Sequence, residues 1–250
     1  MRSLKWNRRG ATFVVAATAS LACLLLAPAT QAEEQITYGK TYAQWSAQWW
    51  QWAYSISKAD DDPISGLGAV DCGRGQKGPV FFLAGLPANY DNLPDEFTEL
   101  SGARECSVPV GKPFFFPLVN AAYYNGPGET ATVAEKREAL DYVMVGARFF
   151  CGATVAIDGS LAYQLPTARV QSPTFLAKPV ADNVFAMPLG TNDPKAVSDG
   201  FWMMVPPLSK GHHTVMLSGI FCKSADTGNP ASQLIPWFSV NMHYDLTVGK

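Results

Sequence analysis

Charged residues of either sign are scarce in this sequence. Only 16% of the 250 residues are charged, with 19 Lys and Arg against 21 Asp and Glu, while 48% are hydrophobic. A disordered chain has the opposite composition, because it lacks the apolar residues needed to offset the entropy lost on folding. The near balance of charge also argues against a surface dedicated to nucleic acid, which needs an excess of basic residues. The composition therefore predicts a globular protein with no nucleic-acid partner.

Motifs of familiar catalytic and metal sites are also missing. The sequence has no Gly-x-Ser-x-Gly elbow and no Cys-x-x-Cys or Cys-x-x-His pair. The acidic run Asp60-Asp61-Asp62 lacks the spaced ligands of an EF-hand and is typical of a turn. We therefore expect no metal and no cofactor.

Histidine is rare, with only His212, His213 and His243 in the chain. We expect His212 and His243 on a solvent face and His213 on the same side of its strand as Val215. His243 and Asp245 point the same way on another predicted strand, so a Ser–His–acid site assembled from separate segments stays open. The sequence does not decide whether the protein is an enzyme.

Residues 1–32 have the pattern of an export signal. Four basic residues occupy the first nine positions, an apolar run extends from Ala11 to about Pro28, and Thr30-Gln31-Ala32 supplies small residues for cleavage. An uncleaved membrane anchor is the alternative, since the apolar run approaches the roughly 18 residues that span a bilayer. Pro28 and the cleavage motif favour removal. We expect residues 33–250 to form a single secreted or periplasmic domain with no transmembrane segment.

Removal of this signal changes the charge and the cysteine count. It takes four of the 19 basic residues and no acidic one, leaving 218 residues with a net charge of −6. It also takes Cys23 and leaves four cysteines, an even number that indicates two disulfides in an exported chain. Four cysteines permit three pairings, of which we favour Cys72–Cys106 and Cys151–Cys222.

The aromatic residues are concentrated near the start of the mature chain. Within Thr41–Tyr54, four rings at helical spacing form one broad stripe, and glutamines occupy much of the opposite side. The stripe consists of Tyr42, Trp45, Trp49 and Trp52. This pattern predicts an amphipathic helix whose tryptophans pack against the rest of the domain.

The remainder of the chain has a β pattern. Short apolar or alternating runs are separated by Gly, Pro and Asn, and the strands predicted from them include Leu161–Leu165 and Asn183–Met187. Asp158-Gly159 predicts a hairpin turn. A second helix is predicted over Val133–Val143, because Thr132 and Glu135 form a capping box. About nine strands without an alternating βαβ pattern predict a mainly β fold, an antiparallel jelly-roll-like sandwich with an N-terminal Trp-rich helix and one further short helix.

Several segments resemble a group of exported bacterial proteins of uncharacterised function. The most specific is the helix Gly39-Lys-Thr-Tyr-Ala-Gln-Trp-Ser-Ala-Gln-Trp-Trp-Gln-Trp52. The other matching segments are residues 78–85, 108–117 and 199–215. The resemblance implies an exported single domain and carries over no activity or catalytic residue.

The aromatic rings outside the main stripe are the best candidates for ligand contact. Exposed Trp and Tyr rings can stack on sugars, and we expect Trp50, Tyr54, Trp202 and Trp237 to be the ligand-facing rings. The leading hypothesis is an exported β-sandwich that binds a carbohydrate or another cell-envelope component without catalysis. One alternative is a polysaccharide hydrolase or lyase that uses carboxylates from separate strands, and another is a structural subunit of a surface assembly. The oligomeric state and the ligand do not follow from the sequence.

Overall fold

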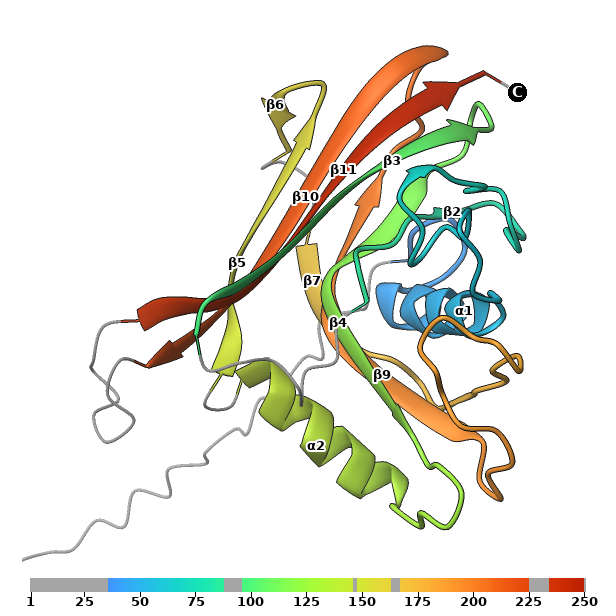
Figure 1. Ribbon diagram of the computed structural model, residues 1–250, viewed down its shortest axis with the longest axis vertical. Helices are drawn as coiled ribbons and strands as arrows, with labels where there is room; N and C mark the ends of the chain where they lie inside the picture. Colours follow the sequence, from blue (N-terminus) through green and yellow to red (C-terminus); the bar gives the residue numbers. More distant parts are fainter. Residues whose placement is uncertain (1–35, 88–95, 146–147, 163–166, 225–233, 250) are drawn as a thin grey trace, which may run out of the picture. The chain divides into compact units, whose positions relative to one another are not determined.

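The computed structural model describes residues 36–87, 96–145, 148–162, 167–224 and 234–249. This part of the chain contains two helices, α1 (Tyr42–Tyr54) and α2 (Val133–Val145), and eleven strands (Figure 1). The strands are β1 (Gly68–Ala69), β2 (Phe81–Phe82), β3 (Thr98–Val108), β4 (Phe114–Tyr124), β5 (Arg148–Ile157), β6 (Ser160–Leu161), β7 (Thr167–Gln171), β8 (Phe175–Leu176), β9 (Lys195–Val205), β10 (Gly211–Ser224) and β11 (Leu234–Val248).

The strands form two sheets. One has six strands in the order β1-β3-β11-β10-β5-β6, and the other has the order β2-β4-β9-β7 with β8 paired to β9. Strand β10 runs antiparallel to both of its neighbours, β11 and β5, whereas β3 runs parallel to β11 along its whole length. The mainly β, two-sheet arrangement with a Trp-rich N-terminal helix confirms the predicted fold class. The strand pairing is mixed, and the jelly-roll connectivity stays a prediction.

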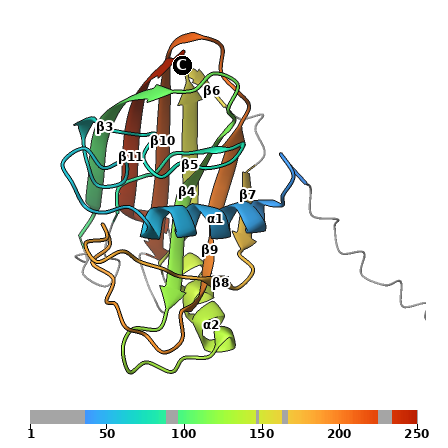
Figure 2. The same cartoon turned by 90° about the vertical axis from the view of Figure 1, so that its right-hand side faces the viewer.

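Helix α1 lies across the outer face of the five-stranded sheet (Figure 2). It begins at an N-cap, Thr41, whose hydroxyl accepts the Gln44 N–H while the Gln44 side chain accepts the Thr41 N–H, so two amides at the helix start are satisfied. The Trp49 ring packs edge-on against the Trp202 ring of β9, with the two ring centroids 5.5 Å apart. The predicted aromatic stripe is therefore confirmed as the packing face of this helix.

The five-stranded sheet is covered on both faces, which explains its continuous apolar sequence. On β4, Phe115 packs with the α1 tryptophans, whereas Phe114 and Phe116 point to the other side. There they pack with Tyr244 and Leu246 of the six-stranded sheet. The main core thus lies between the two sheets, and a second core lies beneath α1.

Helix α2 confirms the predicted second helix and its cap. The Thr132 N–H donates to the Glu135 carboxylate at 2.7 Å, and the Glu135 N–H donates to the Thr132 hydroxyl at 3.3 Å. On β7, Arg169 makes two hydrogen bonds to Asp199 of β9, at 3.0 and 2.8 Å, and one to Asp141 of α2 at 2.6 Å. This charged group attaches the helix to the sheet.

The two disulfides join the pairs favoured from the sequence, Cys72–Cys106 and Cys151–Cys222. The second connects the adjacent strands β5 and β10. The first connects the segment before β2 to the last part of β3.

One predicted strand is wrong. Residues 183–187 form a turn-rich loop, because the Asn183 side chain replaces a partner strand. Its amide donates to the carbonyls of Val180 and Met187, and its oxygen accepts the N–H groups of Phe185 and Met187.

Other predictions lie outside the described residues. These are the export signal, with its cleavage after residue 32, and the end of the strand predicted over Leu161–Leu165. Among the residues that the structure describes, no helix combines the length and the apolar character that crossing a bilayer requires.

Two neighbouring tryptophans of α1 allow a matched test of how the helix is held. The indole N–H of Trp49 donates to the Leu83 carbonyl at 2.8 Å, whereas that of Trp50 has no hydrogen-bond partner among the described residues. Both rings are buried. Trp49→Phe should therefore lower the free energy of unfolding by about 1–3 kcal/mol more than Trp50→Phe, because it leaves a buried carbonyl unpaired. Urea denaturation followed by circular dichroism measures the difference, and equal losses would contradict this account.

Candidate functional site

The four rings predicted to face a ligand all lie in the core. None of Trp50, Tyr54, Trp202 and Trp237 exposes more than 7% of its surface. The rings of Trp50 and Tyr54 are covered by Phe185, with centroids 5.5 and 5.8 Å away. The expectation that they are ligand-facing is therefore wrong, because the loop built around Asn183 covers the flank of α1.

The two strand tryptophans are buried for a similar reason. The ring of Trp202 stacks on Phe115 at 5.0 Å, under α1. Trp237 belongs to a third apolar cluster with Phe238 and with Met144 of α2. Helices therefore cover the strand positions at which the sequence predicted exposed rings.

The three histidines do not converge. The Nδ1 atom of His212 lies 3.4 Å from the Thr247 hydroxyl, and His243 lies opposite Met216 in the strand pairing. His213 instead contacts Asp158, a residue of the β5–β6 turn, at 2.7 Å. Among the described residues, no group of His, Cys, Asp and Glu is arranged to hold a metal ion.

The acidic run at residues 60–62 forms a turn. The Asp62 carboxylate is buried and accepts the N–H groups of Ile64 and Ser65, at 2.8 and 2.6 Å, and the Ser65 hydroxyl at 2.6 Å. Burial alone would raise the pKa of Asp62, but these hydrogen bonds outweigh it and lower the pKa below its usual value. The carboxylate oxygens of Asp62 thus stabilise the turn by accepting its hydrogen bonds.

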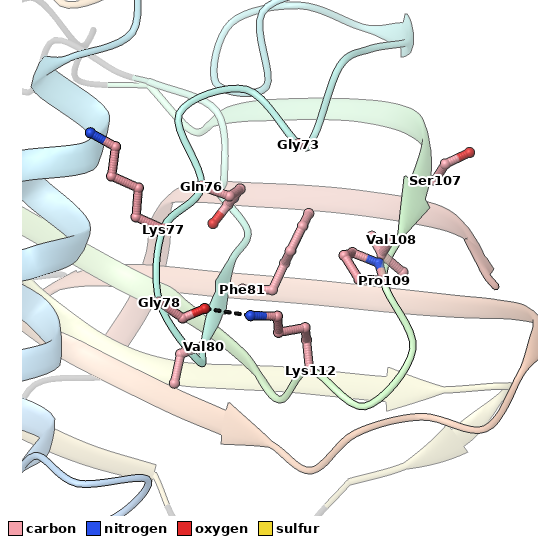
Figure 3. Close-up of a pocket in the computed structure, with 10 residues that line it drawn as sticks. All are labelled: Gly73, Gln76, Lys77, Gly78, Val80, Phe81, Ser107, Val108, Pro109 and Lys112. Atoms are coloured by element: carbon pink, nitrogen blue, oxygen red, sulfur yellow. Dashed lines mark hydrogen bonds between the residues drawn. The ribbon is translucent and has the colours of Figure 1, made fainter. Parts of the chain in front are cut away.

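A pocket of about 430 Å³ lies between the loop of residues 73–81 and residues 107–112, which form the end of β3 and the turn that leads to β4. Figure 3 shows Lys112 reaching across to the Gly78 carbonyl, to which its ammonium donates a hydrogen bond. The Lys77 side chain points away from Phe81 and the other lining residues. The lining contains two lysines and no carboxylate. The Lys112 ammonium therefore lies in the pocket wall, and no carboxylate of the lining pairs with it.

The pocket loop is folded onto the sheet by a glutamine. The Gln76 amide donates to the carbonyls of Cys72 and Phe82 at 3.2 and 2.8 Å, while its oxygen accepts the Phe82 N–H at 2.9 Å. The disulfide from Cys72 reaches Cys106, one residue before the other wall begins. Both walls are thus tied together covalently.

Helix α1 supports the same loop. The indole N–H of Trp52 donates to the Arg74 carbonyl at 2.9 Å, and that of Trp49 donates to the Leu83 carbonyl. These bonds hold the loop near both of its ends. The Trp-rich helix therefore acts on the pocket by positioning its wall.

Arg104 fixes both ends of the longer segment that carries this loop. It is fully buried on β3 and donates to the Gly66 carbonyl at 2.8 Å and the Ala84 carbonyl at 2.7 Å. It also donates to the Tyr244 hydroxyl at 2.7 Å, and that hydroxyl donates to the Ala84 carbonyl at 2.6 Å. The guanidinium makes no ion pair with a described carboxylate, so carbonyl dipoles and the hydroxyl solvate its charge.

The described carboxyl groups give no support to an acid that works by a raised pKa. The pKa shifts that are resolved for carboxyl groups, those of Asp62, Glu135, Asp158 and Asp193, are all downward. Burial acts to raise them, and the hydrogen bonds that they receive outweigh its effect. A general acid in glycoside hydrolysis needs the opposite shift.

Comparisons with known proteins do not place the chain in a family. No family model matches the chain, and searches of curated proteins and of solved structures find no match. The resemblance to exported proteins of uncharacterised function stays a prediction.

The sequence carries only a weak signal for the pocket. Residues 57–78 read as a turn-rich stretch, and the position of Lys112 beside a glycine at a strand start suggests no more than a turn. Pairing of β2 with β4 and the disulfide bring the two walls together.

The role of Arg104 can be tested by a conservative substitution. Arg104→Lys keeps the charge but loses the planar fork that reaches several acceptors at once. We expect the free energy of unfolding to fall by about 2–4 kcal/mol, because buried carbonyls lose charged donors. Arg74→Lys is the control, since Arg74 is partly exposed and pairs with Asp61 at the surface, and it should change stability by about 0.5 kcal/mol or less. Equal effects of the two substitutions in urea denaturation would contradict the assignment.

Proposed function

We propose that the protein binds an acidic sugar or a short acidic glycan of the cell envelope in the pocket between residues 73–81 and 107–112. The supporting observation is the lysine-containing lining without a carboxylate, in a chain whose residues 33–250 carry a net charge of −6. A protein of negative net charge does not attract anions over its whole surface. A local cation in a preformed recess can still select them.

The size and polarity of the recess suit one or two sugar rings. Ligand pockets commonly enclose about 300–1,000 Å³, and this one has about 430 Å³. The Lys112 ammonium can exchange the Gly78 carbonyl for a ligand carboxylate, because a carboxylate adds the attraction of a full negative charge, which a neutral carbonyl lacks. Ser107 adds a hydroxyl for neutral sugar groups.

Rigidity of the walls supports binding. The disulfide, the Gln76 hydrogen bonds and the indole donors of α1 fix the loop before a ligand arrives. A preorganised site loses less conformational entropy on binding than a loop that must fold around its ligand.

The envelope setting rests on the disulfides and on the predicted export signal. Stable disulfides form in oxidising compartments such as the periplasm and the extracellular space. Both disulfides lie in the described domain. Acidic glycans at the cell surface are ligands that a protein in those compartments would meet.

Binding to a panel of glycans tests the proposal. We expect glycans that bear uronate, sulfate or phosphate groups to bind, and neutral glycans of equal length to bind at least tenfold more weakly. Lys112→Gln should weaken the acidic ligand about 10- to 100-fold, as expected for loss of a charged hydrogen bond. Isothermal titration calorimetry measures the dissociation constants.

Lys58→Gln is the matched control, because Lys58 is an exposed lysine outside the pocket lining. It removes the same charge and should leave affinity within about twofold. Equal losses for the two variants would indicate attraction by net charge alone, and tighter binding of neutral glycans would contradict the proposal.

A further inference from the structure

Three side chains from separate segments form a linear hydrogen-bonded group outside the pocket. Ser209 lies in the loop before β10, His213 lies on β10, and Asp158 lies in the turn between β5 and β6. The Ser209 Oγ atom is 3.2 Å from Nε2 of His213, and Nδ1 of His213 is 2.7 Å from an Asp158 carboxylate oxygen. The order hydroxyl, imidazole, carboxylate, with the hydroxyl at one ring nitrogen and the carboxylate at the other, is that of a nucleophilic serine site.

The carboxylate is held in a fixed orientation. Asp158 and Gly159 both have positive φ, 50° and 75°, as the tight hairpin turn requires. The Asp158 N–H donates to the Thr214 carbonyl at 2.9 Å, and the Thr214 N–H donates to one carboxylate oxygen at 2.9 Å. The second oxygen faces His213. Asp158 is thus a positioning residue that keeps the proton of the neutral imidazole on Nδ1.

The other ring nitrogen has two partners on the same serine. Nε2 of His213 lies 3.0 Å from the Ser209 carbonyl oxygen as well as 3.2 Å from its hydroxyl. A protonated ring donates to the carbonyl. A neutral ring, protonated on Nδ1, presents a lone pair on Nε2 that accepts the Ser209 hydroxyl proton. Only the neutral form can act as a general base toward the serine.

We propose that Ser209, His213 and Asp158 form a nucleophilic site that hydrolyses esters carrying a small acyl group, an activity beyond the glycan binding proposed above. Ser209 Oγ attacks the ester carbonyl carbon while His213 Nε2 takes the hydroxyl proton. The bond to the leaving oxygen breaks as that proton passes to it, which leaves an acyl-serine. A water then attacks the acyl carbon, gives one proton to His213 and releases the carboxylic acid, and the proton returns to Ser209.

The surroundings favour esters over amides. Ser209 and Asp158 are exposed, so water is not excluded and electrostatic help from the site is modest. An ester has a better leaving group than an amide and needs less assistance. The N–H of Lys210, the residue after the nucleophile, makes no backbone hydrogen bond to another described residue and can donate to the developing oxyanion.

A serine-directed fluorophosphonate probe tests the nucleophile directly. We expect the intact protein to gain one label at pH 8.5, mapped to Ser209 by peptide mass spectrometry, and to hydrolyse p-nitrophenyl acetate. Ser209→Ala should lose both. Ser101→Ala is the matched control, because Ser101 is exposed on β3 and belongs to no such group, and it should react as the unmodified protein does.

The histidine and the carboxylate are tested by rate and by pH. His213→Gln should slow labelling about 100-fold or more, the contribution expected of a general base. Asp158 raises the pKa of His213 above its usual value, so the labelling rate should rise as the pH increases through that raised pKa. Asp158→Asn should move this rise to lower pH. Circular dichroism confirms that each variant is folded.

Two outcomes overturn the assignment. One is no label on Ser209 at pH 8.5 above the level in Ser209→Ala. The other is an equal labelling rate in folded His213→Gln, which would identify an ordinary exposed serine. Neither outcome affects the glycan-binding proposal, because none of the three residues lines the pocket.

Discussion

The structure around the pocket depends on the hydrogen bonds of one buried guanidinium, that of Arg104. A charge that is fully removed from water must be solvated by the protein itself, and here carbonyl groups at residues 66 and 84 do so. These carbonyls belong to the two ends of the segment that forms one pocket wall. Hydrogen bonds from a single side chain therefore hold both ends of that segment, and Tyr244 extends the same hydrogen-bond network to β11.

Helix α1 completes this arrangement from the other side. Its indole rings fill the space over the five-stranded sheet, and two of its indole N–H groups end on carbonyls of the pocket segment. Aromatic side chains suit this role because they combine a large apolar area with one polar donor. The abundance of tryptophan is thus explained by packing and positioning. No tryptophan lines the pocket, whose walls combine lysine, serine, glutamine and glycine with apolar side chains.

The sequence predicted what depends on local spacing. The aromatic stripe and the capping box at Thr132 act within a few residues, and the helices appear where these patterns place them. Burial of Trp50 and Trp202 was not predictable, because periodicity defines a face but not what covers it. The pocket and the group at Ser209 join segments far apart in the chain, whose positions depend on strand pairing that sequence spacing does not determine.

The most direct test of the central claim, a preformed pocket for an acidic glycan, is to map ligand contacts on the isotopically labelled protein by two-dimensional NMR. Trigalacturonic acid is a suitable probe, with maltotriose as its neutral counterpart of equal length. The acidic trisaccharide should perturb the amide resonances of residues 73–81 and 107–112, and maltotriose should perturb them only weakly. Perturbations centred elsewhere, or equal responses to the two sugars, would contradict the claim.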